Sequence, residues 1–326
     1  MNTKTHIYLK FIQIVALTTF CLFSSAQNAD YPSKPLLFVV PFSPGSGTDT
    51  LARSLAQEIT FQFNINVIVD DKPGANGFIA AQFVAKAAPD GYTVLITTNT
   101  THAANEHLFK KIPYDPVKDF TPVALLGKGY MALVVNNNSN IKSVSELIQE
   151  AKRRPGQINF GSGSSSSRLA GELLRQMTGI EINNIPYKSN PLALTDLIGG
   201  HFDFMFIDAP TGVPQIKSEK LRAIAISGTK HIATLPGIPT VEEAGIKGYD
   251  MSFWTAAYLP AGAPTAVQKK LHDILVKVSN SKSVGGYHSA TGGELVLLGP
   301  DGLAQFQAAE SLKWGQIIKN AGIQPE

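Results

Sequence analysis

The sequence predicts an α/β protein of two lobes, each a mainly parallel sheet flanked by helices. Strand-like and helix-like segments alternate over most of the 326 residues, and this order places strands in parallel with right-handed crossovers. The alternation is interrupted near residue 123 and then restarts. The length allows two domains, and the content of 44% hydrophobic and 16% charged residues is typical of a globular protein rather than a disordered one.

The first 26 residues have the pattern of a secretory signal peptide. Lys4 and Lys10 precede an apolar stretch at 11–23, and small residues then allow cleavage near Ala26. The stretch is shorter than the roughly 20 apolar residues of a membrane-spanning helix. Lipoprotein processing at Cys21 is the alternative, but a bulky aromatic residue precedes this cysteine where such sites require a small one. We therefore expect an exported protein of the periplasm.

Residues 36–42 read as a buried strand, and a helix is expected over 49–63 because apolar residues recur there every four positions. A second strand at 66–69 is followed by a turn and a helix that runs through Ala87. The segment 89–98 is a turn leading into a third strand. These elements form a βαβαβ unit, which begins the first lobe.

The second lobe follows an extended apolar segment. Its expected strands are 158–163, 182–187, 202–208 and 221–227, and its expected helices are 143–154 and 164–179. A further extended segment at 251–259 and helices near 263–280 and 301–320 come after these strands. We interpret 123–135 and 248–259 as crossings between the lobes. The predicted boundaries are a signal peptide 1–26, a first lobe 27–126 and 251–326, and a second lobe 127–250.

Charge and cysteine content exclude several classes of function. The formal net charge is +3, and two of the positive charges lie in the N-terminal segment, so no basic surface for nucleic acid is indicated. Cys21 is the only cysteine, which leaves the exported chain without a disulfide, a thiol nucleophile or a thiolate metal site. The histidines lack metal-ligand spacing. We expect no metal and no cofactor.

Each predicted lobe has a strand that ends in a loop of small residues before a helix. The first loop is FSPGSGTD (42–49), and the second lies in NFGSGSSSSRLAGE (159–172), with its serine loop at 162–167. Ligands of open α/β sheets bind beyond the carboxyl ends of the strands, and helix N-termini attract anions. Two such loops facing each other would hold a small carboxylate from both sides, and Arg168 could add a bidentate contact. The loop TTNTTHAAN (97–105) would open onto the same site.

Motifs for other functions fit poorly. A P-loop requires Lys-Ser/Thr after its last glycine, whereas Thr48-Asp49 follow Gly47, and neither the dinucleotide fingerprint nor the frame G-x-S-x-G is present. An exported serine hydrolase of esters or amides, using Ser46 or Ser164, remains an alternative. A ligand sensor for a two-component system is another.

Several segments together resemble the Bug family of periplasmic substrate-binding proteins, the TctC-like receptors of tripartite tricarboxylate transporters. They include YPSKPLLFVVPFSPGSGTDTLAR, KPGANGFIAAQFVAKAAPDGYTVL, YDPVKDFTPVALL and LPGIPTVEEAGIKGYD. The resemblance implies a Venus-flytrap fold that closes about a hinge on a small organic carboxylate. It also implies no enzymatic activity and delivery of the ligand to membrane permease subunits of such a transporter. We expect a monomer.

The predicted ligand-binding residues lie in the three loops, at strand ends or in the second crossing segment. They are Phe42, Ser43, Ser46, Gly47, Thr48, Thr98, Asn99, His102, Ser162, Ser164, Ser165, Ser166, Arg168, Asp208 and Trp254. Arg168 suggests a dicarboxylate or an aromatic carboxylate, on which Phe42 and Trp254 would stack. Asp208 departs from the family pattern, because relatives often have asparagine there, and its carboxylate would repel an anion unless it is paired or points away.

Overall fold

The computed structural model describes residues 31–326, and the fold below is that of the unit Lys34–Glu326. The expected signal peptide 1–26, with its cleavage near Ala26, lies outside the described residues. None of the helices between residues 31 and 326 has both the length and the apolar character of a membrane span.

Nine strands of the described chain form one sheet with the order β2-β1-β3-β9-β4-β7-β5-β6, and β8 pairs with β4. The strands are β1 (Leu36–Val40), β2 (Val67–Asp71), β3 (Thr93–Thr98), β4 (Phe120–Asn136), β5 (Ile158–Ser162), β6 (Ile182–Pro186), β7 (Phe204–Asp208), β8 (Leu221–Ile226) and β9 (Ser252–Pro260). The α-helices are α2 (Gly47–Phe63), α3 (Phe78–Ala85), α4 (Asn105–Leu108), α5 (Val144–Arg153), α6 (Ser165–Thr178), α7 (Asn190–Ile198), α8 (Ala209–Lys217), α9 (Thr265–Ser279), α10 (Lys282–Thr291) and α11 (Pro300–Asn320). A short 3₁₀ turn, η1 (Ala75–Gly77), precedes α3, and a π-helical turn, η2 (Thr100–Ala104), precedes α4.

The sheet has two halves, each with a parallel part. We call β2, β1, β3 and β9 the first half-sheet, and β7, β5, β6 and β8 the second. Strand β1 is parallel to β2 and β3, and β5 is parallel to β6 and β7, as the sequence predicted. Strand β4 joins the halves, because it runs antiparallel to β9 over 120–130 and antiparallel to β7 and β8 over 131–136. The predicted lobe boundaries at 126 and 250 stay a prediction.

Ser227 ties the strands together where β4 passes from one half to the other. Its N–H donates to the Met131 carbonyl at 2.8 Å and its hydroxyl to the Met251 carbonyl at 2.6 Å. The Met131 N–H donates to the Ser227 hydroxyl at 2.9 Å, and the Met251 N–H to the Ser227 carbonyl at 2.7 Å. A single buried serine therefore fixes the point where β4 and the segment entering β9 run side by side.

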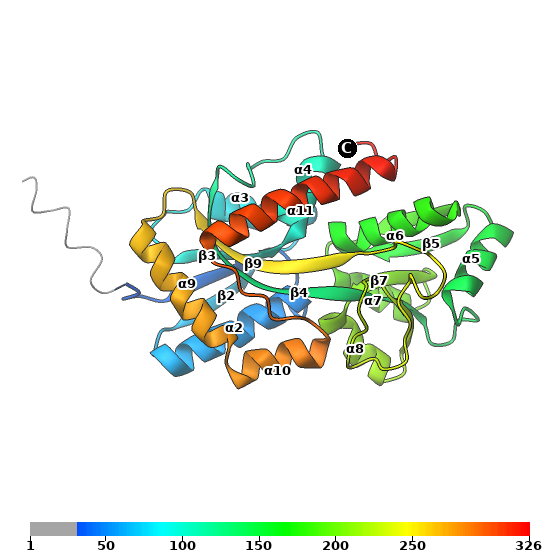
Figure 1. Ribbon diagram of the computed structural model, residues 1–326, viewed down its shortest axis with the longest axis horizontal. Helices are drawn as coiled ribbons and strands as arrows, with labels where there is room; N and C mark the ends of the chain where they lie inside the picture. The colour runs from blue at the N-terminus through cyan, green and yellow to red at the C-terminus, as the bar shows by residue number, and fades with distance from the viewer. Residues whose placement is uncertain (1–30) are drawn as a thin grey trace, which may run out of the picture. The chain divides into compact units, whose positions relative to one another are not determined.

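Helices cover both faces of the first half-sheet: α2, α9 and α10 lie on one side, and α3, α4 and α11 on the other (Figure 1). One cluster of buried apolar side chains continues from Leu95 on β3 through Trp254 on β9 to Phe204 on β7. This continuous core supports the carboxyl ends of β1, β3, β5 and β7, where polar loops begin.

Candidate functional site

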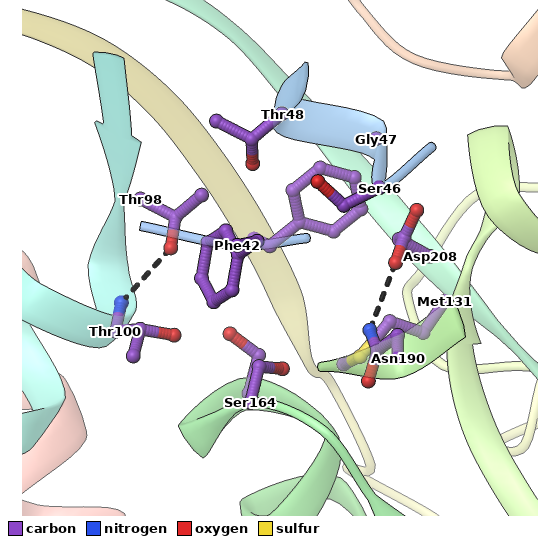
Figure 2. A pocket seen from close by; sticks show the side chains of 12 residues that line it. Phe42, Ser46, Gly47, Thr48, Thr98, Thr100, Met131, Ser164, Asn190 and Asp208 are labelled. Atoms are coloured by element: carbon purple, nitrogen blue, oxygen red, sulfur yellow. Dashed lines mark hydrogen bonds between the residues drawn. The ribbon is translucent and has the colours of Figure 1, made fainter. Parts of the chain in front are cut away.

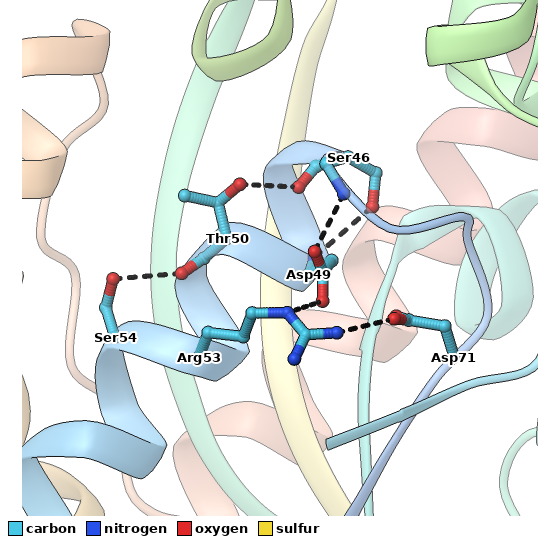
Figure 3. Close-up of polar contacts among 7 residues, drawn as sticks. Ser46, Asp49, Thr50, Arg53, Ser54 and Asp71 are labelled. Carbon is cyan, nitrogen blue, oxygen red and sulfur yellow. Dashed lines mark hydrogen bonds and ion pairs between the residues drawn. The ribbon is translucent and has the colours of Figure 1, made fainter.

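The loop between β1 and α2 is fixed by its own side chains (Figure 3). Gly45 has φ +80°, a left-handed conformation that glycine adopts without strain. Ser46 caps α2 by accepting the Asp49 N–H at 3.3 Å, and the Asp49 carboxylate accepts the Gly45 N–H at 2.8 Å. Asp49 thus points back into its own loop rather than toward a ligand.

A charged network holds this loop to the neighbouring strand. The Arg53 Nε lies 2.7 Å from Asp49 Oδ1, and its Nη2 donates to Asp71 Oδ2 on β2 at 2.8 Å (Figure 3). Burial, together with the charge of Asp49, raises the pKa of Asp71 from its usual 3.8 to about 6, while Arg53 opposes this shift. The network stabilises one conformation of the loop.

Four helices begin around one pocket. Helix α2 is capped by Ser46 and α6 by Ser164, which forms a capping box with Ser167. Helix α7 starts after Ser189, and α8 starts after Asp208, whose carboxylate accepts the Thr211 N–H at 3.1 Å. The first N–H groups of each helix have no carbonyl of the same helix within reach, and each N-terminus carries about half a positive charge. Donors and positive potential therefore converge on the pocket.

Besides the four helix N-termini, the end of β3 brings hydroxyl groups to the pocket. The hydroxyl of Thr98 accepts the Thr100 N–H at 3.2 Å. The hydroxyl of Thr100 is buried and, within the described chain, has no hydrogen-bond partner. Because an unpaired buried hydroxyl costs about 1–3 kcal/mol, a partner supplied by a ligand would be favourable.

These elements enclose a cavity of about 40 Å³ (Figure 2). Its lining residues are Phe42, Ser46, Gly47, Thr48, Thr98, Thr100, Met131, Ser164, Ser166, Asn190, Asp208 and Phe253. Three of them supply apolar walls, and most of the others supply hydroxyl, amide or backbone donors. Within the described residues, no Lys, Arg or His lines the cavity, and Asp208 is its one charged side chain.

Direct contacts between the two halves close the pocket. The Ser189 hydroxyl donates to the Ser43 hydroxyl at 2.8 Å, and Asn99 Nδ2 donates to the Ser166 hydroxyl at 2.7 Å. The Ser165 hydroxyl also donates to Asn105 Oδ1 at 2.9 Å. Loops of the first half-sheet therefore touch the N-termini of α6 and α7, which belong to the second half.

The structure brings eight of the fifteen predicted residues to the cavity. They are Phe42, Ser46, Gly47, Thr48, Thr98, Ser164, Ser166 and Asp208. Ser43, Asn99 and Ser165 lie beside it and form the contacts between the halves. Ser162 instead donates to Asn184 Oδ1 on β6 at 2.6 Å. Whether these residues bind ligand remains a prediction.

Arg168, His102 and Trp254 were also predicted but lie away from the cavity lining. In each case, other contacts of the side chain explain its position. Arg168 is on α6, but its guanidinium forms an ion pair with Glu326 at 2.7 Å. His102 stacks on Tyr258 in the core, where burial lowers its pKa from 6.5 to about 3, so it carries no charge for an anion. Trp254 is buried in the core cluster, and its indole N–H donates to Glu310 Oε2 at 3.1 Å.

Four lining residues were not among the predicted ones: Thr100, Met131, Asn190 and Phe253. Thr100 belongs to the loop that the sequence singled out, and a count of hydroxyls in that loop could have included it. Phe253 precedes Trp254, and alternation along a strand places only one of two neighbours on a given face. Asn190 begins α7, a helix that the sequence pattern did not predict, so nothing in the sequence pointed to this residue.

Two half-sheets joined by β4 and β9, with helix N-termini gathered on a pocket between them, define a solute-binding protein of the periplasmic type. Comparison with known protein families supports this class. The chain belongs to the tripartite tricarboxylate transporter family of receptors (TctC), whose family model matches residues 51–323. The Bug resemblance drawn from the sequence is thereby confirmed.

Known relatives cover almost the whole chain. Protein BugT of Bordetella pertussis is 33% identical over 295 residues, 90% of each chain. Rpa4515 of R. palustris, solved with adipate, superimposes with a TM-score of 0.88 at 32% identity and covers 91% of this chain and 100% of its own. MatC from Rhodopseudomonas palustris, solved with malate, has a TM-score of 0.83 at 28% identity. The match covers 88% of this chain and 100% of MatC. The predicted two-lobed α/β fold is confirmed by these structures.

Proposed function

We propose that this receptor captures a small organic carboxylate in the periplasm by closing about a hinge, and delivers it to the permease subunits of a tripartite tricarboxylate transporter. The observation that carries the proposal is the convergence of four helix N-termini and the unpaired Thr100 hydroxyl on one cavity. Two relatives were solved with the carboxylates adipate and malate, which supports the same ligand class.

The chemistry of the lining favours an anion held by neutral donors. Each helix N-terminus contributes about 0.3–1 kcal/mol to a nearby negative charge, and a hydrogen bond to a charged group contributes about 1.5–3 kcal/mol. The N–H groups of Gly47 and Thr48 lie in the first turn of α2, and those of Ser165 and Ser166 in the first turn of α6. A carboxylate between these turns would accept hydrogen bonds from both half-sheets.

Closure of the two halves is the mechanism we propose. Helix α2 belongs to the first half-sheet, whereas α6, α7 and α8 belong to the second. In an open form, an anion would meet either the α2 N-terminus or the three N-termini of the second half-sheet, and only the closed form would present all four to the same anion. Because the ligand gains more contacts in the closed form, binding shifts the population toward it.

We further propose that the protein is not an enzyme and acts as a monomer. The Ser46 hydroxyl is occupied by the Asp49 N–H at 3.3 Å, and the Ser164 hydroxyl by the Ser167 N–H at 3.2 Å. No histidine among the described residues lines the cavity, so neither serine has the adjacent general base that a hydrolase requires. The hydrolase alternative is therefore not favoured.

Calorimetry on the purified protein tests the ligand class. Acetate, propionate, lactate, succinate, malate and benzoate would be titrated, with propionamide as the uncharged counterpart of propionate. We expect at least one acid to bind and propionamide not to bind. Thr100→Val should weaken the binding of that acid by roughly 5–10-fold, the value of about one hydrogen bond.

Thr234→Val is the matched control, because the Thr234 hydroxyl is also buried and has no hydrogen-bond partner among residues 31–326, but it lies outside the cavity lining. This control should leave affinity unchanged. Binding of propionamide as tight as that of propionate, or binding of none of the acids, would contradict the proposed function. Loss of acid uptake in cells lacking the permease subunits would then separate transport from a sensor role.

A further inference from the structure

Asp208 is the unusual member of a site built for an anion. It ends β7, caps α8 and is the one charged side chain among the described residues that line the cavity. No Lys or Arg of the described chain forms an ion pair with it. A negative charge therefore faces the space where the carboxylate of the ligand is expected (Figure 2).

The hydrogen bonds around Asp208 show that it acts as an acceptor. Its Oδ1 accepts the Thr211 N–H at 3.1 Å and the Thr211 hydroxyl at 2.6 Å, and its Oδ2 accepts Asn190 Nδ2 at 2.8 Å. The orientation of the Asn190 amide is fixed independently, because its Oδ1 accepts the Gly163 N–H at 3.1 Å. The Asn190 Nδ2 must then donate, and Asp208 must accept.

One acceptor position on Asp208 remains for a ligand. A carboxylate has about four lone-pair positions, and three of those on Asp208 are used by Thr211 and Asn190. The remaining position belongs to Oδ2. A hydroxyl or ammonium group on the ligand could donate to it, whereas a second carboxylate could not.

The position of Gly47 shows how compact such a ligand must be. A Cβ atom on this residue would lie 2.6 Å from Asp208 Oδ1, so the N-terminus of α2 is next to Asp208 in the closed arrangement. A carboxylate bound at this N-terminus would have its donor group on a nearby carbon.

We infer that the ligand is a small monocarboxylate with a hydrogen-bond donor near its carboxyl group, and that Asp208 determines this specificity. The inference rests on the proposed function. It replaces the dicarboxylate or aromatic acid suggested by Arg168, because Arg168 pairs with Glu326 and does not line the cavity. A second carboxylate about 4 Å from Asp208 would be repelled by about 1–4 kcal/mol.

Calorimetric titration of four acids tests the inference: propionate, lactate, alanine and succinate. Lactate and alanine add a hydroxyl or an ammonium group to propionate, and succinate adds a second carboxylate. We expect lactate or alanine to bind at least about tenfold more tightly than propionate, and succinate about tenfold more weakly. Preference for lactate identifies a hydroxyl as the donor, and preference for alanine identifies an ammonium group.

Two variants remove the carboxylate but keep a residue that caps helices well, Asp208→Asn and Asp208→Ser. In both variants, the preference for lactate or alanine over propionate should shrink about tenfold, and succinate should bind about tenfold more tightly than it binds the wild type. Asp301→Asn is the control, because it removes an exposed carboxylate from the first turn of α11, outside the cavity lining. Thermal unfolding of each variant checks that it is folded.

The results separate the inference from the proposed function. Succinate binding as tightly as lactate and alanine, with the ranking unchanged in both Asp208 variants, would overturn the inference and leave a carboxylate receptor intact. Failure of all four acids to bind the wild-type protein would overturn the proposed function as well.

Discussion

The close approach of Gly47 to Asp208 gives a direct test of closure. A Cβ atom on Gly47 would lie 2.6 Å from Asp208 Oδ1 and 3.2 Å from Pro210 Cγ. The carboxylate cannot easily move aside, because Thr211 and Asn190 hold it by three hydrogen bonds. Gly47→Ala should therefore hinder the closed form and leave the open form unaffected.

The expected loss of ligand affinity follows from the free-energy cost of overpacking. One extra methyl group in a well-packed contact costs about 1–3 kcal/mol, which corresponds to an affinity roughly 5–150-fold weaker. The backbone N–H of residue 47 is retained in the variant, so the loss cannot come from a missing donor. The thermal stability of the protein without ligand should not fall, because the clash arises only between the closed halves.

Calorimetry with the tightest-binding acid measures the effect, and Gly285→Ala provides the control. Gly285 also lies in a helix, α10, but a Cβ atom there would meet no atom within 4 Å. The control should bind like the wild type. If Gly47→Ala also binds with unchanged affinity, the contact between α2 and α8 is not part of the ligand-bound state, and the closure argument fails.

Three further predictions concern residues around the site. Arg168→Ala should change affinity less than about threefold, because the arginine pairs with Glu326 at a solvent-screened position; a tenfold loss in calorimetry would instead make it a ligand contact. Burial raises the pKa of Asp71 to about 6, so the stability that this group contributes is full below about pH 4 and is lost as the pH rises through 6. Urea unfolding between pH 4 and 7 should show this loss in the wild type and not in Asp71→Asn, and equal pH slopes would contradict it. Ser227→Ala should lower the free energy of unfolding by about 1–3 kcal/mol, because it leaves the buried Met131 N–H unpaired; an unchanged urea midpoint would show that this hydrogen bond contributes nothing.

The sequence predicted the strands well but missed four of the helices. Strands such as β1 and β7 are short apolar runs bounded by turn residues, so the pattern alone locates them. The missed helices are the one-turn α4 and the longer α7, α8 and α10. Helix α8 contains Pro210, Gly212 and Pro214, and α10 contains Gly285 and Gly286. These residues have low helix propensity, so packing against the rest of the fold must stabilise both helices.

The sequence also located the loops that line the cavity but not the directions of their side chains. In β9, alternation requires Phe253 and Trp254 to face opposite sides. Only the packing of Trp254 against Phe306 and its hydrogen bond to Glu310 decide which one enters the core. Arg168 was expected in the site because it lies early in a helix after the serine loop. Its partner, Glu326, is distant in the sequence, and no local pattern could reveal that pairing.

Among the residues that the structure describes, no cationic side chain lines the cavity, and this has a consequence for release of the ligand. A lysine or arginine in the pocket would attract the anion in the open form as well as in the closed one, and it would pair with Asp208 when no ligand is bound. Helix N-termini act only over about one turn, and three of the four belong to the second half-sheet. Closure therefore adds the α2 N-terminus to the three of the second half-sheet, and opening separates them and weakens the attraction. A receptor that hands its ligand to a permease needs this dependence, because separating the halves is then enough to lower its affinity.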